Sequence, residues 1–253
     1  MELLKTIKNN SRPHVKQFRR FWVSQKKRLT NFEQERKRSL NFFSKYFQID
    51  AKKIYSEHLN SGFRHWYNTR LTQLYKLVGT ASISSTFDME TLYLLVRLSK
   101  PEVIVETGVL YGASSSFILE AIQENGSGKL YSIDLPSKDN VPPKDFLVRE
   151  PVRKNWELIV GDSKEELPRL LNRLKSISHF HHDSLHVFSH MFWEYKTAFD
   201  YLIPSGILSS HDVITAPFDR NAFKEFCKEK HKKYGIFLNT GFTLQACGNK
   251  LKK

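Results

Sequence analysis

VIVETGVLYGASSS, residues 103–116, is the stretch that decides the fold. A short apolar run ends at Glu106, two glycines follow at Gly108 and Gly112, and a helix is predicted to start near Ser114. In an open α/β sheet such a loop lies at the carboxyl ends of the strands, where glycines let a ligand approach the backbone and free helix N–H groups receive an anion. The loop has neither the lysine of a P-loop nor GxGxxG spacing. It indicates a nucleotide-like ligand, and a plain tight turn is the alternative.

Short apolar runs and helical segments alternate on both sides of this stretch. The predicted strands are Glu102–Glu106, Lys129–Asp134, Trp156–Val160, Ser178–Asp183 and Gly206–Ser210. The predicted helices are Glu90–Leu98, Ser114–Glu124, Lys164–Leu174, Phe188–Leu202 and Asn221–Lys230. Strands separated by helices imply right-handed crossovers and a mainly parallel sheet. The runs Tyr234–Leu238 and Phe242–Ala246, joined by Asn239-Thr240-Gly241, predict a terminal antiparallel hairpin.

The N-terminal region is helical and basic. Aromatic and aliphatic residues recur at helical spacing over residues 15–48, and a further helical region covers Lys52–Val78. The first 50 residues hold 13 Lys/Arg against four Asp/Glu, in a chain of net charge +14. Such an excess of positive charge is typical of a solvated helix face, of a helix that lies on a membrane surface, or of a segment that contacts an anionic partner such as nucleic acid. The helices could instead cover the substrate cleft or a subunit interface.

Composition sets the broad class. With 253 residues, of which 40% are hydrophobic, the chain can bury a full core. Mean hydropathy is −0.47, and no run approaches the roughly 20 apolar residues of a membrane-spanning helix. The N-terminus does not resemble a secretory signal, and two cysteines cannot build a disulfide framework. We therefore expect a cytoplasmic protein.

Acidic residues end three successive predicted strands, at Glu106, Asp134 and Asp162. Asp134 lies about one strand–helix unit beyond the glycine loop, where a carboxylate can accept hydrogen bonds from ribose hydroxyls. Each of the three could also serve as a helix cap, and Asp162 is placed to do so. Three carboxylates at one sheet edge favour a ligand site over capping alone.

The next two strands bring acid and histidine residues to the same edge. The fourth ends at Asp183, with His186 three residues on, and the fifth ends at His211-Asp212. His179 and His181 lie within the fourth strand and are interpreted as core or surface histidines. Glu194, on the following helix, either supports the site from behind or lies on a solvated face.

With these residues in place, the sequence resembles the class I S-adenosylmethionine-dependent methyltransferases, in particular the branch with catechol, sugar and macrolide O-methyltransferases. The resemblance covers about residues 84–247 and implies a Rossmann-like sheet of seven strands. It also implies that Glu106 and Ser114 face the methionine end of the cofactor, Asp134 the ribose, and Asp162 with Ser163 the adenine. The implied cofactor-binding residues are Glu106, Gly108, Gly112, Ser114, Asp134, Asp162 and Ser163.

The same resemblance implies a metal-assisted reaction. Asp183, His211 and Asp212 would hold a divalent cation, and His186 would take the proton from the substrate hydroxyl beside Asp183. Many relatives carry a carboxylate or amide where this chain has His211. An imidazole ligand disfavours magnesium and favours manganese, iron or zinc.

The function expected is therefore transfer of a methyl group from S-adenosylmethionine to a hydroxyl of a small molecule or glycan. We divide the chain into a basic helical region, 1–80, and a methyltransferase domain, 81–253. A nucleic-acid methyltransferase, a non-catalytic binding or membrane-surface protein and a metal hydrolase are the alternatives. Peripheral membrane contact and a homo-oligomer are both compatible with the N-terminal helices.

Overall fold

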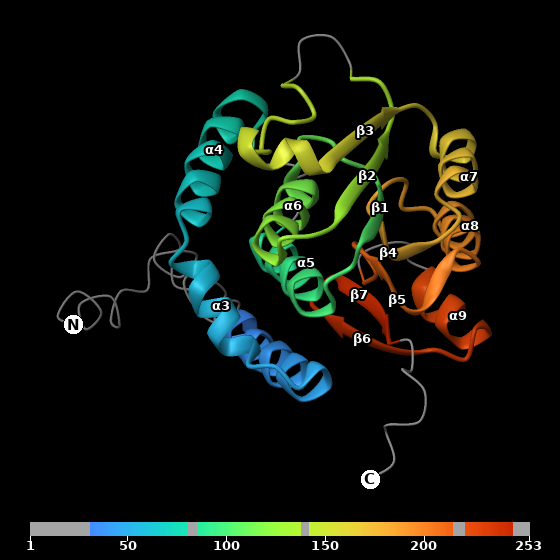
Figure 1. Ribbon diagram of the computed structural model, residues 1–253, viewed down its shortest axis with the longest axis horizontal. Coiled ribbons are helices and arrows are strands. Elements are labelled where there is room, and N and C mark those ends of the chain that lie inside the picture. Colours follow the sequence, from blue (N-terminus) through green and yellow to red (C-terminus); the bar gives the residue numbers. More distant parts are fainter. Residues whose placement is uncertain (1–30, 80–84, 138–141, 215–220, 245–253) are drawn as a thin grey trace, which may run out of the picture.

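The protein is built around one seven-stranded sheet with helices on both faces, as the computed structural model shows in Figure 1. The structure describes residues 31–79, 85–137, 142–214 and 221–244. The strand order is β3-β2-β1-β4-β5-β7-β6, and β7 pairs antiparallel with both neighbours. The strands are β1 (Val103–Thr107), β2 (Lys129–Asp134), β3 (Trp156–Val160), β4 (Ile177–His182), β5 (Leu202–Ser210), β6 (Lys233–Phe237) and β7 (Thr240–Leu244). The predicted mainly parallel sheet with a terminal hairpin is confirmed.

Helices form a layer on each face of the sheet. One face carries α7 (Ser163–Leu174), α8 (Phe188–Phe199) and α9 (Ala222–Glu229), and the other carries α5 (Thr86–Ser99) and α6 (Ala113–Asn125). The helix 31–47, α3 (Ala51–Leu59) and α4 (Gly62–Val78) lie outside α5 and α6. Among the described residues, no helix is long and apolar enough to cross a membrane.

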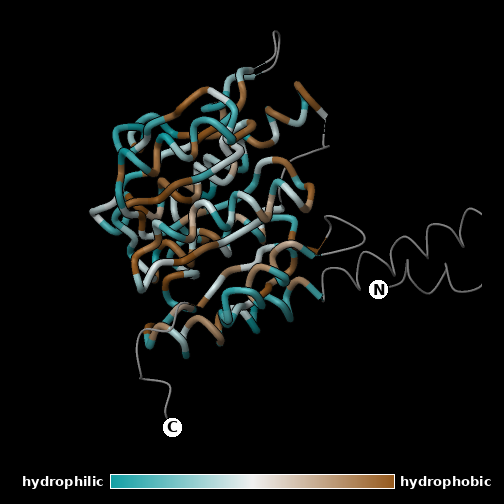
Figure 2. Tube along the Cα trace, turned by 90° about the vertical axis from the view of Figure 1, so that its right-hand side faces the viewer, coloured by the Kyte–Doolittle hydropathy of each residue, from teal (hydrophilic) through white to brown (hydrophobic). Residues whose placement is uncertain are grey.

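Alternation along β1 divides the core in two. Ile104 packs with the layer of α5 and α6, while Val105 packs with the layer of α7, α8 and α9. Both side chains are fully buried, as expected for a central parallel strand covered on both faces. Several brown, hydrophobic stretches cross the interior of the molecule in Figure 2.

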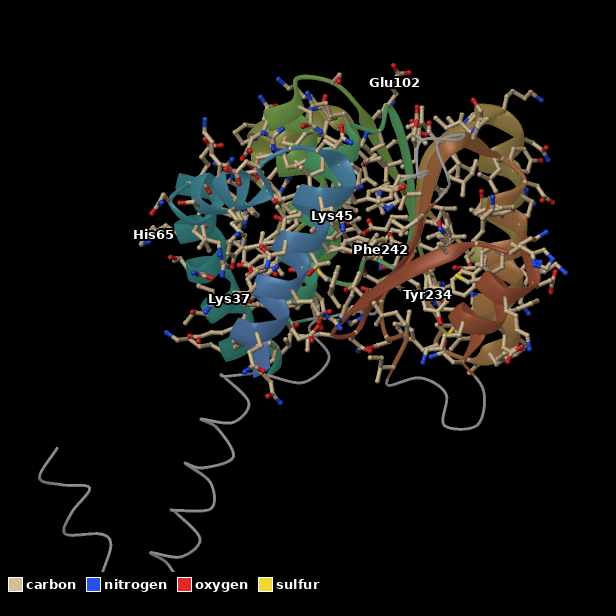
Figure 3. All side chains as sticks on the ribbon, turned by 90° about the horizontal axis from the view of Figure 1, so that it is seen from below. Lys37, Lys45, His65, Glu102, Tyr234 and Phe242 are labelled. Atoms are coloured by element: carbon tan, nitrogen blue, oxygen red, sulfur yellow. The ribbon has the colours of Figure 1, made fainter. Side chains whose placement is uncertain are left out.

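The helix 31–47 is packed against the sheet by aromatic side chains. The ring of Phe43 lies 5.5 Å from those of Phe237 and Phe242, and Phe43 is fully buried. Figure 3 shows Phe242, which lies on the same hairpin as Tyr234, next to the helix that carries Lys37 and Lys45. The hairpin therefore has a covered face.

One predicted basic residue of this helix is not on a solvated face. The Arg36 guanidinium is buried, pairs with the buried Glu90 carboxylate, and lies over the Phe87 ring. Arg64 of α4 reaches the other oxygen of Glu90 at 2.8 Å. Residues 1–30, which contain most of the Lys and Arg residues of the N-terminal region, lie outside the described residues. The predicted domain boundary between residues 80 and 81 also lies outside them.

The predicted helical region Lys52–Val78 consists of two helices, because Asn60 ends α3 and the Ser61 hydroxyl caps α4 through the Arg64 N–H. The structure corrects two other predicted boundaries. The predicted helix 188–202 stops at Phe199, and β5 starts at Leu202. The hairpin turn is Leu238-Asn239, with Leu238 at φ 48°, so Thr240 belongs to β7.

The strand order reverses between β1 and β4. These strands are parallel neighbours, with Thr107 opposite His182. The helix that follows β1 lies on one face of the sheet and the helix that follows β4 lies on the other, which opens a crevice beyond the carboxyl ends of the two strands. The sheet topology thus places the β1 glycine loop beside the segment after β4.

Replacing Phe43 with alanine tests whether the helix 31–47 is part of the folded unit. Loss of a fully buried ring between Phe237 and Phe242 should lower the free energy of unfolding by about 3–5 kcal/mol. Urea titration followed by circular dichroism measures the change. Lys37→Ala, at an exposed position of the same helix, should change stability by less than about 0.5 kcal/mol. Equal effects of both substitutions would contradict this packing.

Candidate functional site

A cleft of about 1350 Å³ lies beyond the carboxyl ends of the parallel strands. Most of the predicted site residues line it. At one end these are Gly108, Ser114, Asp134, Asp162 and Ser163, and at the other Asp183, His186, His211 and Asp212. Glu106 and Gly112 are the two predicted residues that do not line the cleft. Glu106 lies fully buried beneath it.

Both glycines of the β1 loop are required by close backbone contacts. Gly108 has φ 86°, and a Cβ placed there would lie 2.2 Å from the Asp183 carbonyl oxygen. Gly112 has φ 83°, and its Cβ would lie 2.7 Å from the Lys144 carbonyl oxygen. A side chain would therefore be strained and would also push the neighbouring loops apart. Gly108 fixes the distance between the glycine loop and the segment that carries Asp183.

Asp134 is held at the end of β2 by hydrogen bonds to its carboxylate. The Leu110 N–H donates to Oδ2 at 3.0 Å, and the Leu135 N–H donates to Oδ1 at 2.9 Å. The Lys144 ammonium also donates to Oδ2. Because a carboxylate has about four acceptor positions, one further donor can be accepted without displacing Lys144. No sequence pattern identifies this lysine, which lies in the segment after β2.

Glu106 is enclosed by serine side chains. The Ser115 and Ser132 hydroxyls donate to Oε2, whereas Oε1 is buried and has no hydrogen-bond partner among the described residues. Burial raises the pKa of Glu106 to about 7, against the opposing effect of the serine hydroxyls. The carboxyl group is therefore poised to change its charge near neutral pH.

Asp162 and Ser163 lie where β3 passes into α7. The Asp162 carboxylate caps α7 by accepting from the Lys164 N–H at 2.8 Å, so the predicted capping role is confirmed, and the side chain also lines the cleft. The Ser163 hydroxyl lies 3.2 Å from Nε2 of His190. His190 comes from α8 and adds a second residue to this end of the cleft.

Four ligand-type side chains meet at the other end. One atom each from Asp183, His186, His211 and Asp212 can be chosen so that all lie within 4.8 Å of one another. Nδ1 of His211 is 3.2 Å from Oδ1 of Asp183, and Nε2 of His186 is 3.4 Å from the same oxygen. Asp212 has φ 53°, a left-handed conformation that aspartate tolerates better than most residues.

Opposite charges in this cluster stabilise each other's ionised form. Burial by itself would raise the pKa of Asp183, but the His211 and His186 imidazoles beside the carboxylate hold it well below its usual range. Burial would lower the pKa of His211, but Asp183, Asp212 and Asp88 together raise it to about 12. Without a cation, the cluster therefore holds anionic carboxylates around a cationic imidazole.

The chemistry of these donors fits a divalent cation. Both nitrogens of His211 and Nε2 of His186 are buried and have no hydrogen-bond partner among the described residues. Two imidazoles with two carboxylates form a mixed nitrogen and oxygen set, which suits manganese, iron or zinc better than magnesium.

A second buried network lies behind this cluster. The Glu194 carboxylate is fully buried and accepts from Nδ1 of His182 at 2.6 Å and Nε2 of His190 at 2.9 Å. Burial would raise its pKa, but these hydrogen bonds hold it well below the usual range. The Ser184 hydroxyl also donates to Glu194. The solvated-face alternative for Glu194 is therefore wrong, and the residue anchors the segment after β4.

His179 and His181 are core residues. Both are buried in β4. Nε2 of His179 and Nδ1 of His181 lie within hydrogen-bond distance of the Ser209 hydroxyl, at 2.7 and 2.9 Å. Burial lowers the pKa of each to about 3, so both are neutral at physiological pH. The core alternative is confirmed for this pair.

Several cleft residues come from outside the strand-end motifs. Phe32 of the helix 31–47, Asp88 of α5 and Asn239 of the hairpin turn all line the cleft. The Asn239 amide donates to Oδ1 of Asp212. In the sequence, Ser85-x-x-Asp88 predicts only the start of a helix. Phe32 is only one of the regularly spaced apolar residues that a helix buries against its neighbours. Neither signal distinguishes a site residue from a structural one.

The chain is similar to known methyltransferases in sequence and in fold. Residues 105–213 match the family model of a methyltransferase domain. No curated protein sequence matches the chain.

Among solved structures, an SAH-bound methyltransferase of Podospora anserina is 16% identical, with 78% of this chain and 94% of that chain covered and a TM-score of 0.53. The O-methyltransferase of tomaymycin synthesis from Streptomyces achromogenes, in complex with SAM, is 15% identical, with 76% and 95% covered and a TM-score of 0.54. The TDP-rhamnose 3'-O-methyltransferase of calicheamicin biosynthesis is 17% identical, with 75% and 97% covered and a TM-score of 0.51.

At these identities, the solved structures establish the fold. The matched segment runs from Val105 in β1 to Val213, just after His211-Asp212, and so contains the glycine loop and both acid and histidine pairs. Residues 105–213 thus match a methyltransferase domain in sequence, and the chain shares the fold of known methyltransferases.

Proposed function

We propose that the protein transfers a methyl group from S-adenosylmethionine to a hydroxyl of a small molecule or sugar, with help from a divalent cation. The observation that carries this proposal is the shared cleft. The β1 glycine loop and Asp134 lie at one end, and the cluster of Asp183, His186, His211 and Asp212 lies at the other. A cofactor and a metal-bound hydroxyl could therefore meet within one cavity.

The cofactor would lie across the carboxyl ends of β1, β2 and β3. Asp134 would accept a ribose hydroxyl, and Asp162 with Ser163 would border the adenine. The unpartnered Oε1 of Glu106 offers an acceptor toward the amino group of the methionine part. When bound, S-adenosylmethionine supplies a methyl group activated by its sulfonium.

Asp183, His211 and Asp212 would hold the divalent cation. A bound cation lowers the pKa of a coordinated hydroxyl. In this arrangement His186 accepts the proton that the acceptor hydroxyl loses as its oxygen takes the methyl group. His186 lines the cleft. Its Nε2 lies 3.4 Å from Oδ1 of Asp183 and 3.6 Å from Oδ2 of Asp212. These carboxylates stabilise the imidazolium that forms.

The walls around the cluster favour a small acceptor with an apolar or ring-shaped part. Phe32 and Leu238 bring aromatic and aliphatic surface to the cleft, and Asn239 adds an amide. The similar calicheamicin enzyme acts on TDP-rhamnose, which makes a sugar hydroxyl one candidate acceptor.

Calorimetric titration of the full chain with S-adenosylmethionine, with and without EDTA, tests the proposal. We expect micromolar binding of the cofactor in both conditions and binding of Mn²⁺ or Zn²⁺ to the metal-free protein. Absence of cofactor binding at millimolar concentration to folded protein would contradict the proposed activity. Cofactor binding without metal binding would contradict only the cation.

Asp134→Ala should weaken cofactor binding by about 1–3 kcal/mol, since a charged acceptor of ribose hydrogen bonds is lost. Calorimetry measures the dissociation constant, and thermal unfolding checks that the variant folds. Asp145→Ala removes an acidic residue of the same region that pairs with Arg153 and does not line the cleft. It should leave affinity near the wild-type value. An unaltered affinity in Asp134→Ala would exclude Asp134 from the ribose site.

Cofactor affinity should rise with pH between 5.5 and 7.5. The pKa of Glu106 is raised to about 7 in the folded protein, so the carboxyl group is mostly neutral below this value and anionic above it. A cationic amino group binds the anionic form better, by about tenfold. Glu106→Gln should remove most of this dependence. A pH profile that is the same in both proteins would contradict a role of Glu106 in cofactor binding.

His186→Ala should lower turnover by about 10²- to 10⁴-fold, as expected for loss of a positioned base, and leave cofactor affinity nearly unchanged. His65→Ala, an exposed histidine on α4, is the matched control and should have no effect. Metal affinity is measured in parallel. If His186→Ala loses the metal as well, His186 is a ligand and the assignment as base is wrong.

A further inference from the structure

His211 presents its two ring nitrogens to different carboxylates. Nδ1 lies 3.2 Å from Oδ1 of Asp183 and 3.5 Å from Oδ1 of Asp212. Nε2 points the other way and lies 3.7 Å from Oδ2 of Asp88. The imidazole is therefore placed between the proposed metal ligands and an acidic residue of α5.

The Asp88 carboxylate is fixed independently of His211. Its Oδ1 accepts from the Thr240 hydroxyl at 2.9 Å and from the Asn239 N–H at 3.2 Å, and Ser85 contacts its Oδ2. Asp88 is 3% exposed. The β6–β7 turn and β7 thus hold Oδ1, and Ser85 contacts the Oδ2 that faces His211, so the position of the carboxylate does not depend on a cation.

A neutral imidazole that binds a metal through one nitrogen carries its proton on the other, and an acceptor for that proton fixes both the tautomer and the ring orientation. We infer that Asp88 is a positioning residue of the metal site: with a cation on Nδ1 of His211, Oδ2 of Asp88, 3.7 Å from Nε2, would accept the Nε2 proton and keep Nδ1 directed toward Asp183 and Asp212. This inference rests on the proposed metal site. It adds an acidic residue, from outside the matched segment 105–213, to the three proposed ligands.

The hairpin turn completes the same arrangement. Asn239 donates through its backbone N–H to Asp88 and through its side-chain amide to Asp212. One residue of the β6–β7 turn therefore connects the residue behind His211 to a neighbouring proposed ligand. Through these contacts, α5 and the hairpin orient both residues of the His211-Asp212 pair.

Asp88→Asn tests the inference with little change in shape. The amide oxygen can keep the hydrogen bonds from Thr240 and Asn239, while an NH₂ group replaces the oxygen that faces His211. Mn²⁺ affinity of the full chain, measured by calorimetry, should fall about 10- to 100-fold. The visible absorption of bound Co²⁺, which reports nitrogen ligation, should shift or weaken. S-adenosylmethionine affinity should stay near the wild-type value.

Thr240→Val is the matched control, because it removes a hydrogen bond to Oδ1 of Asp88 and leaves Oδ2 untouched. It should change Mn²⁺ affinity by less than about threefold, and thermal unfolding is compared for both variants. Wild-type Mn²⁺ affinity and Co²⁺ absorption in Asp88→Asn would overturn the inference and leave the proposed metal site standing. An equal loss of Mn²⁺ affinity in both variants would also overturn it, because general weakening of the hairpin would then be the cause. A wild-type protein that binds neither metal would instead refute the proposed site itself.

Discussion

The contact on which the site depends is the approach of the β1 glycine loop to the segment after β4. A Cβ at Gly108 would lie 2.2 Å from the Asp183 carbonyl oxygen, so only glycine lets these two segments lie so close. The Asp183 N–H donates to the Thr107 carbonyl at 2.8 Å, which continues the β1–β4 pairing beyond the strands. One backbone contact therefore sets the separation between the proposed cofactor end and the proposed metal end of the cleft.

Buried charge in this protein is compensated locally. Asp183 and Glu194 are anionic although buried, because histidine nitrogens lie beside both carboxylates. Glu106 has only serine partners, and its pKa is raised accordingly. The first two carboxylates therefore keep their charge across the physiological range, whereas Glu106 changes its charge near neutral pH.

The helix 31–47 packs on the β6–β7 hairpin, which forms one edge of the sheet, and both contribute residues to the same cleft. The aromatic contacts of Phe43 hold the helix 31–47 on the hairpin, and Phe32 from this helix lines the cleft. The hairpin turn in its turn contacts Asp88 and Asp212. A segment that resembles a separate basic extension in sequence is thus packed against elements that line the cleft.

The sequence by itself determined the sheet, its hairpin and the strand-end residues, because apolar periodicity and glycine spacing are local and the carboxyl ends of parallel strands share one edge. It could not find Asp88, Asn239 or Phe32, or show that Arg36 and Glu194 are buried. Their partners lie far away in the chain: Asp88 contacts Thr240, 152 positions on, and Thr107 contacts Glu194, 87 positions on. Only the tertiary structure brings such residues together, because contacts between distant segments depend on how helices pack on the sheet and leave no periodic signal in the sequence.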